Sequence, residues 1–516
     1  MRGPTWWWSM PAADRQETLS ARLRKLGSRD PVRTASLLES PALTALLNAD
    51  DAVDDLGLAA DPDLAVHALS KLSQAPSGVR IISSIARDAD LRASLLPVLG
   101  VSVALGEHVI RHSEQLTDLA HRGTGPLPDR HTLRSDLLRG VGADPHVLEP
   151  VANVTGNEAL DALRVEYRRH VLSLASRDLD GAAGMEQVGR ELADIADAVL
   201  EAALAIGRAE LPADSEPCRL AIIGLGKCGA RELNYVSDVD VVFVAEPLAG
   251  GNEERALVTA TRLARSVINA CVATTAEGTI WEVDAGLRPE GKSGALVRTL
   301  ASHVAYYERW AKTWEFQALL KARPSAGDLE LGSAYVEAML PGVWSVADRD
   351  DFVTDVQAMR RRVEEHVPAG EVDREIKLGP GGLRDVEFAV QLLQLVHGRS
   401  DVMLRSPTTL TALEALATWG YVGRDDAATL ASAYRFQRTL EHRLQLRRLR
   451  RTHLLPDDDD ELRVLGRSLG LRVDPATELI DEWKVHQREV RRLHEKLFYR
   501  PLLQAVSYTH LTMPTN

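Results

Sequence analysis

The pattern of hydrophobic positions predicts helices along most of the chain. In residues 15–210, apolar residues recur at spacings of three and four, the period of an amphipathic helix. Clusters of glycine and proline separate these stretches and mark loops. The helices predicted in this region span residues 15–26, 41–47, 63–72, 79–87, 90–99, 159–174 and 185–208.

The pattern changes between residues 211 and 295. Short apolar runs at 218–224 and 238–245 predict buried strands, and the alternation at 281–285 predicts a third strand within 279–287. A helix is expected at 252–273 between the second and third strands. Helical spacing then returns at 300–323, 351–366, 383–397, 406–419, 424–451 and 478–498.

These changes predict an α+β fold that is predominantly helical. A small mixed β-sheet is embedded between N-terminal and C-terminal helical regions. The expected organisation is a disordered N-terminus (1–14), a helical region (15–210), a core with the sheet (211–330), a second helical domain (331–505) and an unstructured tail (506–516). Residues 507–516 lack the Ala/Arg/Leu character of the rest and are interpreted as a tail or a foreign extension.

Composition narrows the class of protein. The 516 residues include 61 Lys and Arg against 74 Asp and Glu, a net charge of −13, which argues against a nucleic-acid-binding surface. No apolar run is long enough for a membrane span or a signal sequence. Three scattered cysteines (Cys218, Cys228 and Cys271) fit a reducing compartment. We therefore expect a cytoplasmic protein with neither a nucleic-acid nor a membrane partner.

The glycine-rich segment 224–240 (GLGKCGARELNYVSDVD) admits two interpretations. In the first, Gly224, Gly226 and Gly229 form a dinucleotide-binding turn after a strand, and Glu246 lies near the place of a ribose-binding acid. That fold needs a crossover helix of about 10–12 residues or more between parallel strands. Residues 230–237 are too short for one, so this interpretation is disfavoured.

The second interpretation is nucleotidyl transfer. Asp238 and Asp240 are two residues apart at the start of a strand, so both carboxylates point to one face. Paired carboxylate oxygens suit Mg²⁺, which keeps sites for water and phosphate oxygens. Beside them, the Gly226 backbone, the Lys227 ammonium and the Ser237 hydroxyl are candidate phosphate contacts.

A third carboxylate strengthens the second interpretation. In the strand predicted at 279–287, Asp284 shares a face with Ile280 and Glu282, and it would meet Asp238 and Asp240 if the two strands are neighbours. We predict Asp238, Asp240 and Asp284 as catalytic metal ligands. Arg288 is then placed to grip phosphate oxygens.

Further candidates lie in the second helical domain and before it. On the helix predicted at 300–323, Lys321 shares a face with an aromatic stripe (Tyr307, Trp310 and Trp314) that we interpret as core, and Lys321 is a candidate phosphate contact. Residues 379–382 form a glycine-rich turn before a helix start, a natural anion site, with Arg384 in the first turn. The basic run at 443–451 is interpreted as a solvated or ion-paired helix face.

Four motifs resemble those of the glutamine-synthetase adenylyltransferase/adenylyl-removing enzyme family. They are residues 224–240, residues 283–294 (VDAGLRPEGKSG), residues 306–323 (YYERWAKTWEFQALLKAR) and residues 376–388 (IKLGPGGLRDVEF). The resemblance extends over about residues 160–450 and implies a nucleotidyltransferase of the DNA-polymerase-β-like type. Family members carry two such halves, whereas this chain has one Gly-rich/Ser-Asp-x-Asp motif, after a long helical region.

That arrangement resembles the adenylyl-removing half. The resemblance implies Mg²⁺-dependent attack of orthophosphate on adenylyl-tyrosine of glutamine synthetase, which releases ADP and regulates nitrogen assimilation. Three alternatives remain: ATP-dependent adenylylation of the same tyrosine, a non-catalytic module that senses a PII-type signalling protein and, least favoured, an NAD-binding oxidoreductase. The partners implied are glutamine synthetase, a PII-type protein, ATP or ADP, and orthophosphate.

Overall fold

The computed structural model describes residues 18–120 and 128–499. The chain divides after Ala120 into two compact units. The predicted disordered N-terminus (1–14) and tail (506–516) lie outside the described residues. The expected domain boundaries at 210/211 and 330/331 stay predictions. In the described part of the chain, no helix is both long and apolar enough to cross a membrane.

The first unit is built from short helices. Several begin where a side chain accepts a hydrogen bond from the third amide of the helix, as Asp61, Asp88 and Ser102 do. Three helices that the periodicity missed, α2, α7 and α8, are included. The bounds are α1 Leu19–Leu26, α2 Pro31–Leu38, α3 Thr44–Leu47, α4 Pro62–Leu72, α5 Gly78–Arg87, α6 Ala89–Leu99, α7 Val103–Arg111 and α8 Leu116–Ala120.

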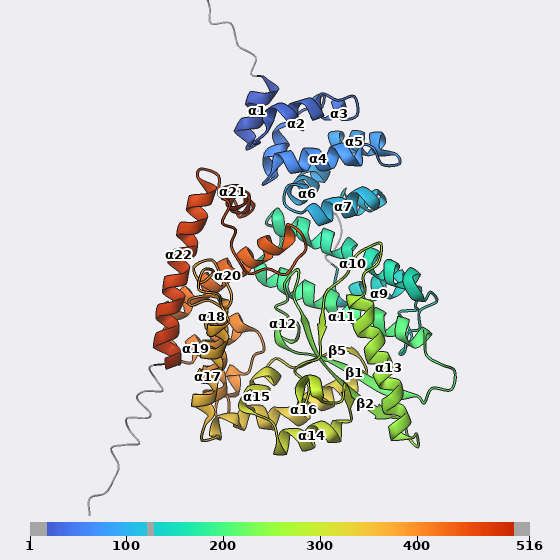
Figure 1. The fold of residues 1–516 in the computed structure, drawn as a ribbon, viewed down its shortest axis with the longest axis vertical. Coiled ribbons are helices and arrows are strands. Elements are labelled where there is room, and N and C mark those ends of the chain that lie inside the picture. Colours follow the sequence, from blue (N-terminus) through green and yellow to red (C-terminus); the bar gives the residue numbers. More distant parts are fainter. Residues whose placement is uncertain (1–17, 121–127, 500–516) are drawn as a thin grey trace, which may run out of the picture. The chain divides into compact units, whose positions relative to one another are not determined.

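The second unit joins a small sheet to a larger set of helices (Figure 1). Its strands are β1 Cys218–Gly224, β2 Val239–Pro247, β3 Val283–Asp284, β4 Val297–Arg298 and β5 Arg323–Gly327. Its helices are α9 Arg130–Gly140, α10 Gly156–Leu179, α11 Met185–Ala209, α12 Gly226–Gly229, α13 Glu253–Val272, α14 Leu300–Arg309, α15 Thr313–Leu319, α16 Leu329–Ser345, α17 Phe352–Glu365, α18 Leu383–His397, α19 Thr409–Thr418, α20 Arg424–Leu446, α21 Asp459–Ser468 and α22 Pro475–His494.

The sheet is mixed, as predicted. Its strand order is β3-β2-β1-β5, and β4 also pairs with β2. β1 runs antiparallel to β2 and to β5, whereas β3 and β4 run parallel to β2. Because β1 ends where β2 begins, the glycine-rich turn after β1 and the first residues of β2 lie at the same edge of the sheet.

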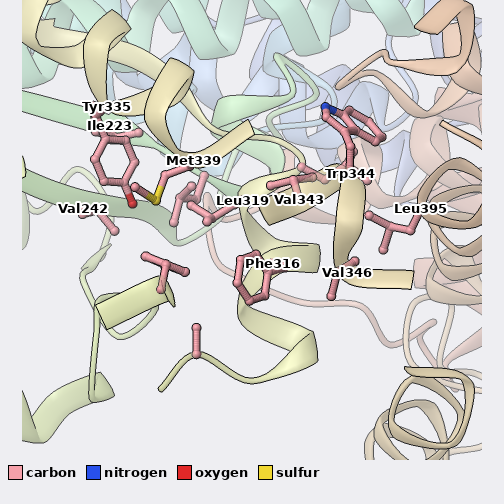
Figure 2. Close-up of a cluster of buried hydrophobic side chains, with 14 of the residues drawn as sticks. Ile223, Val242, Phe316, Leu319, Tyr335, Met339, Val343, Trp344, Val346 and Leu395 are labelled. Carbon is pink, nitrogen blue, oxygen red and sulfur yellow. The ribbon is translucent and has the colours of Figure 1, made fainter. Parts of the chain in front are cut away.

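The apolar runs of β1 and β2 are buried because helices cover the sheet. Ile223 and Val242 are cross-strand neighbours and belong to a core cluster with Tyr335 and Met339 of α16 and Phe316 of α15 (Figure 2). Helices α11 and α13 pack against each other and also contact the sheet. Alternate strand residues are therefore buried on both faces, which is why these strands are almost continuously apolar.

The single helix predicted at 300–323 is wrong. Helix α14 ends at Arg309, α15 is a separate helix, and Arg323 begins β5. The buried Glu315 carboxylate starts α15 by accepting hydrogen bonds from the Lys312 amide (2.8 Å) and the Tyr306 hydroxyl (2.9 Å). Trp310 lies in the break and is 73% exposed, so the predicted aromatic core stripe is wrong there.

Two other predicted elements are shorter than expected. Only Val283–Asp284 of the strand predicted at 279–287 joins the sheet, because the Asp284 carboxylate accepts a hydrogen bond from the Gly286 amide (2.7 Å) and the chain turns. Ile280 and Trp281 are both buried, so the expected alternation of faces fails before the strand begins. Helix α20 ends at Leu446, and the last arginines of the basic run lie beyond it.

Replacing Glu315 tests the break between α14 and α15. We expect Glu315→Ala to lower the free energy of unfolding by about 1–3 kcal/mol, because two hydrogen bonds to a buried carboxylate are lost. Urea unfolding followed by tryptophan fluorescence measures this. Glu308→Ala, at an exposed position of α14, is the control and should have little effect. Equal midpoints for the two variants would contradict this account of the break.

Candidate functional site

Three aspartates meet at the edge of the sheet where β2 begins. Asp238 immediately precedes β2, and Asp240 is its second residue. In the parallel pairing of β2 with β3, Asp240 lies opposite Asp284, and the Val239 amide donates to the Glu282 carbonyl (2.9 Å). The two strands are therefore neighbours, as predicted, and Asp240 and Asp284 lie side by side.

The turn after β1 lies directly against Asp240. The Leu225 amide donates to the Asp240 carbonyl (2.8 Å). Gly226 has φ of +52°, and a Cβ built on it would lie 2.3 Å from Oδ2 of Asp240. Glycine is required here for both its conformation and the missing side chain. The missing side chain thus lets the Asp240 carboxylate lie directly against the backbone of the turn.

Burial and neighbouring carboxylates shift the protonation of Asp240. Burial, the Asp284 carboxylate and the Asp238 carboxylate together raise the pKa of Asp240 to about 6. Arg384 and Lys377 oppose this rise from the helical side. Carboxylate oxygens brought together in this way suit a hard divalent cation such as Mg²⁺.

The three carboxylates do not form a tight ligand cluster. In the described part of the second unit, one group of three acidic or histidine residues has its ligand atoms within 4.8 Å of one another. It consists of Asp136, Glu166 and His170. Arg169 forms ion pairs with Asp136 (3.1 Å) and Glu166 (2.5 Å), so that group has a structural explanation. At the sheet edge, a bound cation would have to draw the aspartates together.

Arg451 is a site residue that sequence reasoning missed. Its guanidinium forms an ion pair with the Asp238 carboxylate. The ion-paired alternative for the basic run agrees with the pairs of Arg443 with Asp178 (2.6 Å) and of Arg451 with Asp238. Arg443 is buried, however, and Arg451 reaches the sheet edge from the segment after α20. The spacing within the run carried no signal of either contact.

Lys227 lies in a buried network of charges. Its ammonium pairs with Glu441 of α20 (3.1 Å), whose other oxygen lies 3.0 Å from Nδ1 of His453 and 3.9 Å from the ammonium of Lys377. Burial lowers the pKa of Lys227 to about 7, and Glu441 opposes this shift. The Lys227 side chain is thus tied to Glu441, a residue that sequence reasoning also missed.

The other predicted phosphate contacts have different partners in the structure. Arg288 donates to the carbonyls of Ala285, Lys292 and Gly294, and so fixes the loop after Asp284. Lys321 pairs with Glu232 (3.1 Å) rather than with one of the three aspartates. Arg384 pairs with Glu387 (3.0 Å) and remains partly exposed, while Ser237 is half-buried beside Asp238.

The dinucleotide-binding interpretation is wrong. The strands on either side of the glycine-rich turn are antiparallel, whereas that fold requires them to be parallel. Glu246 lies at the opposite end of β2 from the glycines, where it is paired with Arg219 in the sheet and accepts a hydrogen bond from the Leu300 amide (2.9 Å).

A mixed sheet that presents aspartates on neighbouring strands beside a glycine-rich turn is an arrangement of the nucleotidyltransferase type. A family model described as glutamate-ammonia ligase adenylyltransferase matches residues 92–338. A second, described as GlnD PII-uridylyltransferase, matches residues 357–498. The two matches cover the sheet and the helices that follow it.

Curated relatives are similar over nearly the whole chain. The bifunctional glutamine synthetase adenylyltransferase/adenylyl-removing enzyme of Streptomyces avermitilis is 54% identical over 502 residues, 96% of this chain and 49% of its own length. That of Streptomyces coelicolor is 53% identical, with 96% and 48% covered. That of Mycobacterium tuberculosis is 48% identical, with 89% and 46% covered.

The resemblance drawn from the motifs is therefore confirmed. The chain is related along most of its length to the glutamine synthetase adenylyltransferase/adenylyl-removing enzymes, which are nucleotidyltransferases. It spans about half the length of the curated relatives it matches.

Neutralising Asp240 should stabilise the metal-free protein. The pKa of Asp240 is about 6 in the folded chain against an ordinary value of 3.8, so its charge costs about 3 kcal/mol of stability at pH 8. Asp240→Asn should recover most of this in the presence of EDTA. As the pH falls from 6 to 4, the native Asp240 takes up a proton and the advantage of the variant should disappear.

Urea unfolding at pH 8 and at pH 4 checks this difference. Glu282→Gln, at an exposed position just before β3, is the control and should leave the unfolding midpoint unchanged at both pH values. A variant Asp240→Asn that is no more stable than the parent chain at pH 8 would show that Asp240 is not crowded by its neighbours.

Proposed function

We propose that the chain is the adenylyl-removing half of a glutamine synthetase adenylyltransferase/adenylyl-removing enzyme. The observation that carries the proposal is the register of β2 and β3, which sets Asp240 beside Asp284. Asp238 lies just before β2, and Gly226 leaves room for the Asp240 carboxylate. Similarity to the named relatives supplies the substrate class.

The reaction proposed is phosphorolysis. An oxygen of orthophosphate attacks the phosphorus of the adenylyl group, a new P–O bond forms and gives ADP, and the P–O bond to the tyrosine of glutamine synthetase breaks. The tyrosine oxygen leaves and takes up a proton. A divalent cation such as Mg²⁺, held by Asp238, Asp240 and Asp284, would stabilise the attacking and leaving oxygens.

The chain's own residues position the phosphates. The backbone at Gly226 offers a close approach to phosphate oxygens beside the carboxylates. Arg384, partly exposed and near enough to affect the pKa of Asp240, supplies positive charge from the helical side. Lys227 and Arg288 support the site through the contacts that hold Glu441 and the loop after Asp284. Ser237 remains a candidate donor beside Asp238.

Lys321 has the weakest support among the proposed phosphate contacts. Its ammonium is buried against Glu232 and Thr409 rather than directed at the carboxylates. We propose that it acts by holding the segment that joins Gly226 to Asp238.

Regulation through a PII-type signalling protein is a further part of the proposal. The region 357–498 that matches the GlnD PII-uridylyltransferase model is the helical part that carries Glu441 and Arg451. A partner bound there would act on residues that contact Lys227 and Asp238. A cytoplasmic location, with nitrogen assimilation as the process regulated, accords with this activity.

Removing two carboxylates tests the proposed reaction. With adenylylated glutamine synthetase, orthophosphate and Mg²⁺, the double variant Asp238→Asn/Asp240→Asn should release ADP at least about 100-fold more slowly, because the charges that hold the cation are gone. Glu282→Gln should keep the parent rate, and EDTA should abolish it. Unchanged ADP release by the double variant would refute the assignment.

A parallel assay separates the direction of the reaction. Unmodified glutamine synthetase and labelled ATP report adenylylation, the second candidate, which uses the same carboxylates. Labelling without phosphate-dependent ADP release would favour that reaction. Neither activity in the parent chain would favour the non-catalytic sensing module.

Gly226 provides a sharper test of the geometry. Gly226→Ala should reduce ADP release by about 10–100-fold, because the new methyl group displaces the Asp240 carboxylate, and positive φ adds about 1 kcal/mol of strain. Gly250→Ala is the matched control, since Gly250 also has positive φ but its Cβ would meet nothing within 4 Å. Equal activity in the two variants would show that the space at Gly226 has no catalytic role.

A further inference from the structure

A second cavity lies in the helical part of the second unit. It has a volume of about 520 Å³ and lies between the start of α11, helix α19 and helix α20. That volume is within the range of about 300–1,000 Å³ typical of small-molecule sites. The carboxylates at the sheet edge do not line it. Its apolar wall is formed mainly by Leu410, Leu413, Ala427, Ala431 and Tyr434.

The polar part of the wall is rich in arginine. Five arginines and three glutamates line the cavity. Arg435 is paired with Glu186 (2.6 Å), and Arg231 is paired with Asp194 outside the wall (2.5 Å). Of the glutamates, Glu232 is already paired with Lys321.

Two of the remaining arginines carry a charge that no described carboxylate balances in an ion pair. Arg190 on α11 and Arg424 on α20 are exposed and line the cavity from different helices. Within the described parts of the chain, neither forms an ion pair. The exposed Glu414 also lines the cavity, so two arginines and one glutamate without an ion pair to a described residue remain. The cavity therefore combines an apolar wall with a net positive charge.

Arg438 adds a buried donor to this wall. Its side chain is fully buried, and one terminal nitrogen donates to the carbonyls of Glu232 (2.8 Å) and Leu233 (3.1 Å). The other terminal nitrogen, Nη1, has no hydrogen-bond partner among the residues that the structure describes. A buried guanidinium donor without an acceptor is costly. An anionic oxygen in the cavity would satisfy it.

We propose that this cavity binds a small organic anion, with a carboxylate or a comparable anionic group toward the arginines and an apolar body on the Leu/Ala wall. Arg231 and Glu232 belong to both the cavity wall and the segment that joins Gly226 to Asp238. Occupancy therefore regulates the sheet-edge site, a part of the inference that rests on the proposed function.

Binding is tested on the full chain with a fluorescent anion, 8-anilinonaphthalene-1-sulfonate. 1-Naphthoate should displace the dye, whereas 1-naphthylmethylammonium, with the same ring system and the opposite charge, should not. Arg190→Glu/Arg424→Glu should weaken naphthoate displacement by more than about 10-fold, because charge-assisted contacts are lost. Arg472→Glu/Arg488→Glu, exposed arginines outside the cavity, should leave it unchanged.

The outcomes are distinct. Equal displacement in both double variants, or equal displacement by the cation, overturns the anion site. Circular dichroism melting of each variant shows whether it is folded. Ala431→Trp fills the cavity without changing its charge and should also abolish displacement of the dye by naphthoate. If the Arg190→Glu/Arg424→Glu variant is misfolded, dye displacement that persists in a folded Ala431→Trp variant overturns the proposal.

Regulation has its own readout. Naphthoate should change the rate of ADP release at least twofold in the parent chain and leave the Arg190→Glu/Arg424→Glu variant unaffected. An unchanged rate at saturating naphthoate overturns the regulatory part. Absence of ADP release without naphthoate refutes the proposed function instead, and the dye measurement still decides whether the cavity binds an anion.

Discussion

The parallel pairing of β2 with the two-residue strand β3 fixes Asp240 opposite Asp284, and the proposed chemistry depends on that register. Without a counterion the arrangement is unfavourable, because Asp238 adds a third negative charge and burial raises the pKa of Asp240. These unfavourable charges lie at the edge of the sheet, whereas helices cover both faces of β1 and β2. A site that is electrostatically strained on a rigid core is what a cation-dependent enzyme needs.

Helix α20 holds the chain between the glycine turn and the aspartates. Glu441 pairs with Lys227, Arg438 binds the carbonyls of Glu232 and Leu233, and the Gln445 side chain accepts a hydrogen bond from the Val236 amide (2.9 Å). The sheet and the helices that follow it are therefore one functional unit. Three residues of this helix contact the segment between Gly226 and Asp238, and we propose that changes in the helical part reach the carboxylates through that segment.

The sequence predicted the parts of the fold that follow a regular period. The strand at 218–224 and the helix at 383–397 agree with β1 and α18 residue for residue, and the strands that carry Asp240 and Asp284 are neighbours, as expected. The break at Trp310 was missed because its cause is a tertiary contact of Glu315 with Tyr306, which leaves helical spacing intact. Arg451 and Glu441 were missed for the same reason, since their partners are about 210 residues away in the chain.

The most direct test of the central claim is calorimetric titration of the metal-free chain with Mn²⁺, a divalent cation that, like Mg²⁺, prefers oxygen ligands. Binding should be present in the parent chain and in Glu282→Gln, and it should weaken by at least about 10-fold in Asp284→Asn, because a ligand from the second strand is lost. Parent-like binding by Asp284→Asn would contradict the account, since Asp284 would then have no share in a site with Asp238 and Asp240.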